Sequence, residues 1–246
     1  MKQRFYTVLA EHYDDFFPVS NPMIQLIAQE SPKPPGTGNH LDIGCATGEL
    51  LLKTRQQFQK SYGIDSEEKM IELADAKSDK FPGVTFQTMN MLHIGEHFPP
   101  NFFNVISCMG NTLVHLPGPK EVGRFITESR KLLSGGGRLI IQILNYQRVI
   151  EQNVTSLKDL TAGRYVFKRS YSILKDHDKV VFHGILVNRK TGKTMRSETS
   201  LYTLTKDVLH ALLEQNGFTG IEHFGSLKKE PYSSESPLLI TAASAG

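Results

Sequence analysis

The feature that most constrains the fold of this chain is a regular alternation of short apolar segments with helical segments. Such an alternation predicts a parallel sheet with helices on both faces. The fourth and fifth apolar segments are almost continuously hydrophobic, which is typical of central strands buried on both sides. Three consecutive glycines, Gly135 to Gly137, are expected to cap the third helix and form a turn. The expected strands are His40–Gly44, Ser61–Asp65, Val84–Thr88, Phe102–Cys108 and Arg138–Leu144, and the expected helices are Glu49–Phe58, Glu67–Ala76 and Lys120–Leu133.

The periodicity changes to two between about residues 163 and 201. Turns are expected at Asp176-His177-Asp178 and at Lys190-Thr191-Gly192-Lys193, so this segment predicts an antiparallel meander of three strands. One face of the first strand is expected to carry Tyr165, Phe167, Arg169, Tyr171 and Ile173.

The order of helix and strand returns after the meander, with a helix over Thr205–Gln215 and strands over Gly220–Phe224 and Pro237–Ala242. The meander is therefore interpreted as an insertion rather than as a second fold. We expect a single domain over residues 1–246, with a helical N-terminal cap over residues 1–35 and an antiparallel insertion over about residues 146–203 on the substrate side.

Composition excludes several classes of protein. The chain has 246 residues, 39% of them hydrophobic, and its 20 glycines bring the apolar share to roughly 47%, which is ordinary for a globular protein and argues against a disordered or fibrous chain. No apolar segment approaches the roughly 18–20 residues of a membrane helix, and the N-terminus lacks the pattern of a signal peptide. The formal net charge is +3 and no basic run exceeds two residues, so nucleic-acid binding is not expected. The default expectation is a cytoplasmic, soluble protein.

A turn rich in small residues lies where the first strand meets the first helix. Gly44, Ala46 and Gly48 would let a ligand approach the backbone closely, at the sheet edge where open α/β sheets bind ligands. Asp65 follows Gly44 by 21 residues and ends the second strand, where a carboxylate can accept hydrogen bonds from ribose hydroxyls. The alternative is a tight structural turn and an acid that caps a helix.

The residues of this turn discriminate between nucleoside ligands. A dinucleotide-binding turn has glycines at its first, third and sixth places, and this chain has Ala46 and Glu49 at the third and sixth. A carboxylate at the helix N-terminus would repel a pyrophosphate but would tolerate a cationic sulfonium. The triphosphate-binding pattern GxxxxGK[ST] is absent from the sequence. These features favour S-adenosylmethionine over a nicotinamide dinucleotide.

The sequence resembles the class I S-adenosylmethionine-dependent methyltransferases over essentially its whole length. Leu41–Glu49 (LDIGCATGE) is similar to their first motif and Gly63–Met70 (GIDSEEKM) to their second-strand motif. The resemblance implies a Rossmann-like, mostly parallel sheet of seven strands with the last strand antiparallel, helices on both faces and a small antiparallel insertion after the fifth strand. It implies S-adenosyl-L-methionine as cofactor, bound by Tyr13, Asp42, Gly44, Cys45, Ala46, Gly48, Asp65, Ser66, Met70, Asn90, Met91 and Cys108.

Two further segments resemble the glycine/sarcosine N-methyltransferase branch: residues 102–118 (FFNVISCMGNTLVHLPG) and 143–150 (ILNYQRVI). The resemblance implies methyl transfer to a small-molecule acceptor, with an amine nitrogen as the favoured site. The catalytic residues implied are Asn111, His115 and Tyr146.

Position 144 departs from that branch. It carries Leu144 where the branch places an arginine that binds the substrate carboxylate, so a bidentate contact is lost. We therefore expect a neutral or partly apolar amine rather than a glycine-like acid, unless Arg164 or Arg169 reaches the site from the meander.

The sequence leaves several alternatives open. Transfer to oxygen or sulfur, and a protein that binds the cofactor without catalysis, stay open beside N-methylation. Asn111 and His115 are also compatible with a turn cap and a packed side chain. His93 and His97 are four residues apart but are expected in a loop without a third ligand, so no metal is expected. The insertion is compatible with a cover over the substrate or with a subunit contact in a homo-oligomer.

Overall fold

The computed structural model describes residues 2–176 and 178–246. Met1 and His177 lie outside the described residues, and with His177 part of the turn expected at residues 176–178. The helices are α1 (Lys2–Glu11), α2 (Tyr13–Phe16), α3 (Asn21–Glu30), α4 (Glu49–Thr54), α5 (Glu68–Ser78), α6 (Ile94–His97), α7 (Pro119–Leu132), α8 (Tyr146–Glu151) and α9 (Lys206–Gln215), with short 3-10 turns η1 (Arg55–Gln57), η2 (Met91–His93) and η3 (Leu113–His115).

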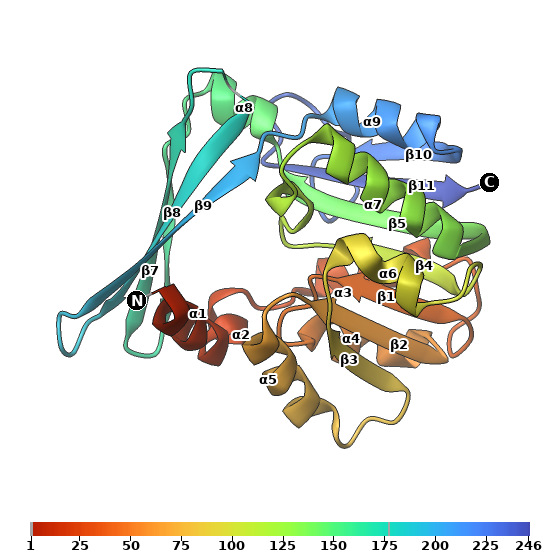
Figure 1. Ribbon diagram of the computed structural model, residues 1–246, viewed down its shortest axis with the longest axis horizontal. Coiled ribbons are helices and arrows are strands. Elements are labelled where there is room, and N and C mark those ends of the chain that lie inside the picture. The colour runs from red at the N-terminus through yellow and green to blue at the C-terminus, as the bar shows by residue number, and fades with distance from the viewer. Residues whose placement is uncertain (1, 177) are drawn as a thin grey trace.

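The strands form two separate sheets (Figure 1). The larger sheet has seven strands: β1 (Asn39–Ile43), β2 (Lys60–Asp65), β3 (Val84–Thr88), β4 (Phe103–Cys108), β5 (Leu133–Leu144), β10 (Phe218–Phe224) and β11 (Leu238–Ala245). The smaller sheet has four: β6 (Ser156–Ala162), β7 (Tyr165–Ile173), β8 (Lys179–Asn188) and β9 (Thr194–Tyr202).

The larger sheet has the expected topology. Its strands lie in the order β10-β11-β5-β4-β1-β2-β3. β1 to β5 pair in parallel, whereas β11 is antiparallel to both of its neighbours, β5 and β10. The prediction of a mostly parallel sheet with a reversed last strand is confirmed.

Alternating side chains of β5 bury both faces of the larger sheet. Leu139 and Ile141 belong to the core cluster that includes residues of α7 and α9, whereas Ile140 belongs to the cluster formed with α3 and α4. Figure 1 shows where these helices lie around the sheet. All three β5 residues are at most 1% exposed, so each contributes about 1.5–3 kcal/mol of burial free energy. The nearly continuous apolar run of β5 follows from this two-sided burial.

Two local expectations were wrong. α7 ends at Leu132 and Leu133 is already extended, so Gly135 to Gly137 lie within β5. Leu133 and Arg138 pair with Phe103 and Val105, and the residues between them form a bulge opposite a single β4 residue. The segment around His93 and His97 is helical rather than a loop, and His93 pairs with Glu96 at 2.8 Å.

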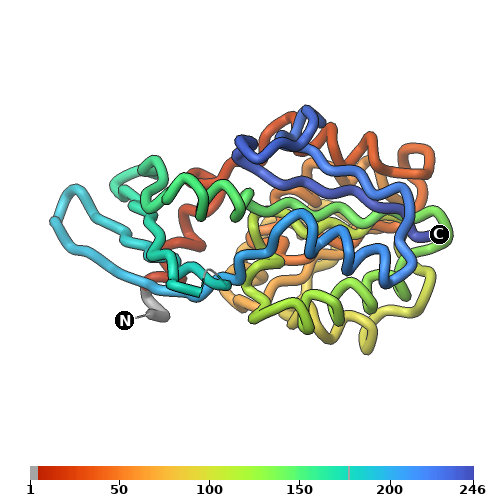
Figure 2. The backbone as a smooth tube through the Cα atoms, turned by 90° about the horizontal axis from the view of Figure 1, so that it is seen from above, coloured from red at the N-terminus to blue at the C-terminus, as the bar shows by residue number. Residues whose placement is uncertain are grey.

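The smaller sheet projects beyond one end of the larger sheet (Figures 1 and 2). It lies between α8 and α9 in the chain and has the strand order β6-β7-β8-β9. The expectation of three strands missed β6. α1 and α2 pack on this sheet, where Phe5 and Phe16 share a buried cluster with Phe167 and Leu186. The N-terminal helices thus join the two sheets.

No helix in the described ranges is long and apolar enough for a membrane span.

Candidate active site

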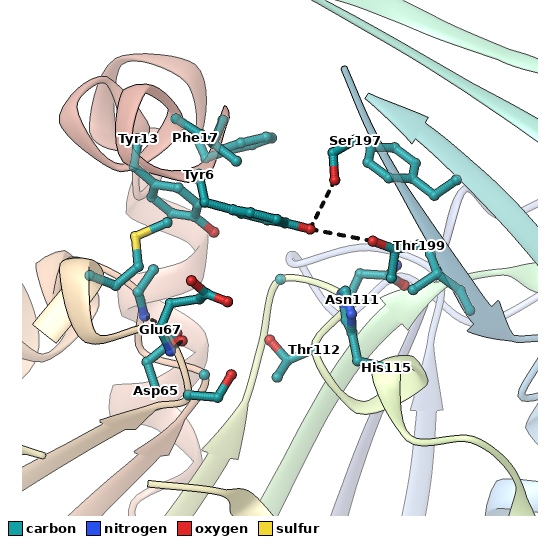
Figure 3. A pocket seen from close by; sticks show the side chains of 18 of the residues that line it. Tyr6, Tyr13, Phe17, Asp65, Glu67, Asn111, Thr112, His115, Ser197 and Thr199 are labelled. Carbon is teal, nitrogen blue, oxygen red and sulfur yellow. Dashed lines mark hydrogen bonds between the residues drawn. The ribbon is translucent and has the colours of Figure 1, made fainter. Parts of the chain in front are cut away.

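A cavity of about 830 Å³ lies between the carboxyl ends of the parallel strands and the inner face of the smaller sheet. Its size is within the usual range for small-molecule sites, and its place is the edge where open α/β sheets bind ligands. Figure 3 shows Asp65 and Glu67 at one end of it and Asn111 and His115 at the other. Tyr6 of α1 lines the cavity, and its hydroxyl bonds with two residues of β9, Ser197 at 3.1 Å and Thr199 at 3.4 Å.

The turn after β1 is tightly built. The amides of Gly44 and Cys45 both donate to the carbonyl of Ile64, at 2.8 and 2.9 Å. Gly44 has φ +70°, and a Cβ atom there would lie 2.6 Å from Oγ1 of Thr112. Because only glycine fits this position without displacing Thr112, the sequence requires glycine for both conformation and space.

Asp65 connects the turns after β1 and β2. Its Oδ2 accepts a hydrogen bond from the amide of Ala46 at 3.0 Å, and its Oδ1 accepts one from the amide of Glu67 at 3.0 Å. Burial raises the pKa of this carboxyl, although the backbone hydrogen bonds oppose the shift. The side chain also lines the cavity. Asp65 therefore has a structural role in the two turns, as the alternative interpretation of the sequence expected. Its side chain is also placed to contact a ligand.

The acidic end of the cavity fits S-adenosylmethionine. Asp65 and Glu67 supply negative charge that suits a ligand with sulfonium and ammonium groups. Burial and the nearby Asp65 raise the pKa of the Tyr13 hydroxyl, which therefore stays protonated as a donor. Carboxylate oxygens are acceptors for ribose hydroxyls, and methionine side chains offer an adaptable apolar surface for a flat ring. Eight of the residues expected to bind the cofactor line this cavity: Tyr13, Gly44, Ala46, Asp65, Ser66, Met70, Asn90 and Met91.

The other four expected cofactor residues lie behind the cavity wall: Asp42, Cys45, Gly48 and Cys108. Cys45 and Cys108 are buried and free, and Gly48 precedes α4 with φ +77°. Glu49, on which the argument against a pyrophosphate rested, does not line the cavity and pairs with Lys53 at 3.1 Å and Lys77 at 3.7 Å. Its charge is therefore partly offset on the outer side of the turn.

Asp42 belongs to a buried hydrogen-bonded chain beneath the cofactor turn. The Ser107 hydroxyl donates to Oδ1 of Asp42 at 2.6 Å and lies 2.8 Å from Nε2 of His40. Burial raises the pKa of Asp42 to about 7, and burial lowers the pKa of His40 to about 3. The imidazole is therefore neutral and donates from Nε2 to the serine oxygen.

These two shifts predict opposite effects of pH on stability. Above pH ~4 the folded state holds a proton on Asp42 that the unfolded state releases, so stability falls as pH rises to about 7. Below pH ~6.5 the unfolded state protonates His40 and the folded state does not, so stability falls as pH drops. Between about pH 4 and 6.5 the two contributions offset each other.

When either Asp42 or His40 is replaced, the pH dependence of stability that the other residue causes should no longer be offset. We expect Asp42→Asn to become more stable relative to wild type as pH rises from 4.5 to 6.5, and His40→Gln to become less stable. Each change amounts to at most about a tenfold shift in the unfolding equilibrium constant per pH unit. Urea unfolding at three pH values measures these differences. Stability curves of the variants that run parallel to that of the wild type would contradict this assignment.

Asn111 and Tyr146 form the opposite end of the site. Asn111 has φ +69°, a conformation that asparagine tolerates, and its Oδ1 accepts the amide of Leu144 at 3.0 Å. Its Nδ2 donates to the Tyr146 hydroxyl at 2.9 Å. Tyr146 is fully buried and does not line the cavity, so it positions Asn111 rather than meeting a ligand.

His115 lies beside Asn111 and faces the same cavity. The residue is exposed by its accessible surface, and partial desolvation of the ring by the neighbouring protein lowers its pKa. The imidazole is therefore neutral at pH 7 and can accept a proton.

The smaller sheet contributes residues of β7 to the cavity, among them one of the two arginines that the sequence offered for an acceptor carboxylate. Leu144 lines the cavity as expected, and Arg169 and Tyr171 line it from β7. Arg164 lies elsewhere, in a cleft with His12 and Arg189. The alternation along β7 identified Arg169 and Tyr171 as facing one way, but only the fold shows what they face. Tyr6, Glu67, Thr112 and Ser197 carry no signal in the sequence that would have found them.

Comparisons with known proteins agree with this geometry. Residues 41–137 match a family model described as a methyltransferase domain. A dTDP-4-amino-2,3,4,6-tetradeoxy-D-glucose N,N-dimethyltransferase from Saccharopolyspora spinosa is 23% identical over 197 residues, which cover 79% of this chain and 76% of that protein. The glycine/sarcosine/dimethylglycine N-methyltransferase of Actinopolyspora halophila is 23% identical over 208 residues, which cover 82% of this chain and 35% of that protein.

A solved structure shares the fold. The S-adenosylmethionine-dependent methyltransferase from Clostridium acetobutylicum superposes with a TM-score of 0.82 at 13% identity, covering 98% of this chain and 99% of that one. This likeness confirms the expected Rossmann-like fold, and the family match confirms the methyltransferase domain that the sequence motifs indicated. Residues 41–137 of this chain form a methyltransferase domain, and the chain is a methyltransferase.

Proposed function

We propose that this enzyme transfers the methyl group to the nitrogen of a small-molecule amine. The observation that carries the proposal is that Asn111 and a neutral His115 line the same end of the cavity, opposite Asp65 and Glu67. Both curated relatives described above are named for methylation of nitrogen, one on an amino sugar and the other on amino acids. The cavity volume of about 830 Å³ supports a small acceptor beside the cofactor.

The residues of this end meet the requirements of the reaction. S-adenosylmethionine supplies an electrophilic methyl group on a sulfonium sulfur. The chain has to hold the amine nitrogen in line with that group and to exclude water. Asn111 is fixed by the amide of Leu144 and the hydroxyl of Tyr146, so its remaining N–H is directed by a rigid amide. Neutral His115 accepts the proton that the amine loses.

The test is an assay of purified enzyme against amines, thiols and phenols, with the methylated atom identified by mass spectrometry and NMR. We expect transfer to nitrogen, with an acid limb in kcat at saturating amine that reflects protonation of His115; kcat/KM also reports protonation of the free amine, so it is compared between variants on the same substrate. His115→Gln should lower kcat by about 100-fold or more and remove that acid limb.

His183→Gln is the matched control, because His183 bonds with Ser172 and Glu198 at the smaller sheet and does not line the cavity. This variant should behave as wild type. Methyl groups found only on oxygen or sulfur would overturn the proposal. Binding of the cofactor without turnover of any acceptor would favour the non-catalytic alternative.

A further inference from the structure

The cavity has an asymmetric distribution of charge. Its cofactor end carries Asp65 and Glu67, whereas Lys158 and Arg169 line it from the smaller sheet. An acceptor that fills the space between these ends meets acids on one side and cations on the other. Arg169 is the more deeply placed of the two cations, since Lys158 is exposed and Arg169 is half-buried.

The guanidinium of Arg169 lacks a carboxylate partner among the residues that the structure describes. Its Nη2 donates to the carbonyl of Lys158 at 2.9 Å, but its Nε is buried without a hydrogen-bond partner. The nearest acid on its own sheet, Asp159, pairs instead with Lys168 at 3.9 Å. A buried donor of a charged group that stays unpaired is costly, so this arrangement is typical of a site that a ligand completes.

Packing holds this guanidinium in place. Its central carbon lies 5.8 Å from the ring centre of Phe17 and 5.9 Å from that of Phe167. Burial lowers the pKa of the group without removing its charge. On the same face of β7, the next residue is Tyr171, whose hydroxyl interacts with that of Tyr146. Tyr171 is thus linked through Tyr146 to Asn111, and Arg169 lies two residues before Tyr171 on the same face of β7.

The geometry points to an oxyanion on the acceptor amine, a carboxylate or a phosphate, that binds Arg169 while the nitrogen lies at Asn111 and His115. This inference rests on the proposed function and specifies the substrate class of the same site. The cation that binds the acceptor then lies on the smaller sheet, because the larger sheet presents the uncharged Leu144 to the cavity. The planar guanidinium suits an oxyanion because it can donate two parallel hydrogen bonds.

The experiment measures binding to enzyme saturated with S-adenosylhomocysteine, by isothermal titration with matched pairs of amines. Phenylalanine and phenylalaninamide test a carboxylate, and glucosamine 6-phosphate and glucosamine test a phosphate. We expect the anionic member of at least one pair to bind about tenfold or more tightly than its neutral partner. The pair that shows the preference identifies the oxyanion.

Variants then assign the preference to Arg169. Arg169→Met should remove this preference, because it lowers the affinity for the anionic amine much more than that for the neutral amine. Arg169→Lys should retain part of the preference. Lys168→Met is the matched control, because this neighbour is exposed, pairs with Asp159 and lies outside the cavity. It should leave the preference unchanged.

The outcomes separate this inference from the proposed function. Equal binding within both pairs, or an equal loss for both members in Arg169→Met, would overturn the role of Arg169. Methylation of neutral amines without a preference for the acid would sustain the proposed function and overturn this inference. A preference for the anionic amine that depends on Arg169, without methyl transfer to nitrogen, would sustain the role of Arg169 and overturn the proposed function.

Discussion

Gly44→Val is expected to abolish cofactor binding. The Cβ atom of any side chain at this position would lie 2.6 Å from Oγ1 of Thr112 and closer still to its methyl group. The backbone also has φ +70°, which β-branched residues rarely adopt. Valine therefore has to displace Thr112 and change the turn that lines the cavity. We expect a loss of affinity for S-adenosylhomocysteine of at least about 100-fold, measured by isothermal titration.

Gly192→Val separates strain from lost space. Gly192 has a similar φ of +68° in the turn between β8 and β9, but a Cβ atom there would meet nothing within 4 Å. This control should lose some stability through backbone strain and keep its cofactor affinity. Circular dichroism of Gly44→Val checks that the fold is retained. Normal cofactor binding by a folded Gly44→Val would contradict the assignment of this turn.

The strands of the larger sheet were predictable because strands buried on both faces appear in the sequence as short, nearly continuous apolar segments. Val84–Thr88 is found at the expected bounds, and Phe102–Cys108 is shorter by one residue. β6 was missed because it does not alternate strictly. Its bulge turns Leu157 and Leu160 to the same face although they are three residues apart, as their pairing with Arg169 and Phe167 shows. A period of two cannot be read through such a shift.

The cofactor end of the site was predictable for a different reason. A turn that approaches a ligand requires glycine at position 44. Asp65, the acid that ends β2, follows this glycine by 21 residues, so both residues can be recognised from the local sequence. The acceptor end depends on elements that are far apart in sequence, such as Tyr6 of α1 beside Ser197 of β9. Nothing local distinguishes these side chains from ordinary core and surface residues, and only the packing of α1 on the smaller sheet brings them together.

Asp65→Ala is expected to weaken binding of S-adenosylhomocysteine by about 10- to 150-fold, because it removes a charged acceptor that lines the cavity. The range corresponds to about 1.5–3 kcal/mol for a hydrogen bond to a charged group. The same change leaves the amides of Ala46 and Glu67 without their acceptor, so part of the loss could arise from a distorted turn.

Asp65→Asn separates these two causes. Its amide oxygen can still accept one backbone hydrogen bond, so we expect unfolding by urea to be closer to that of wild type than for Asp65→Ala. Its affinity for S-adenosylhomocysteine should stay low, because the charge is absent. Asp75→Ala, an exposed acid of α5 outside the cavity, controls for a general change in net charge. If Asp65→Asn regains wild-type affinity together with stability, Asp65 acts on the cofactor only through the backbone turns that it connects.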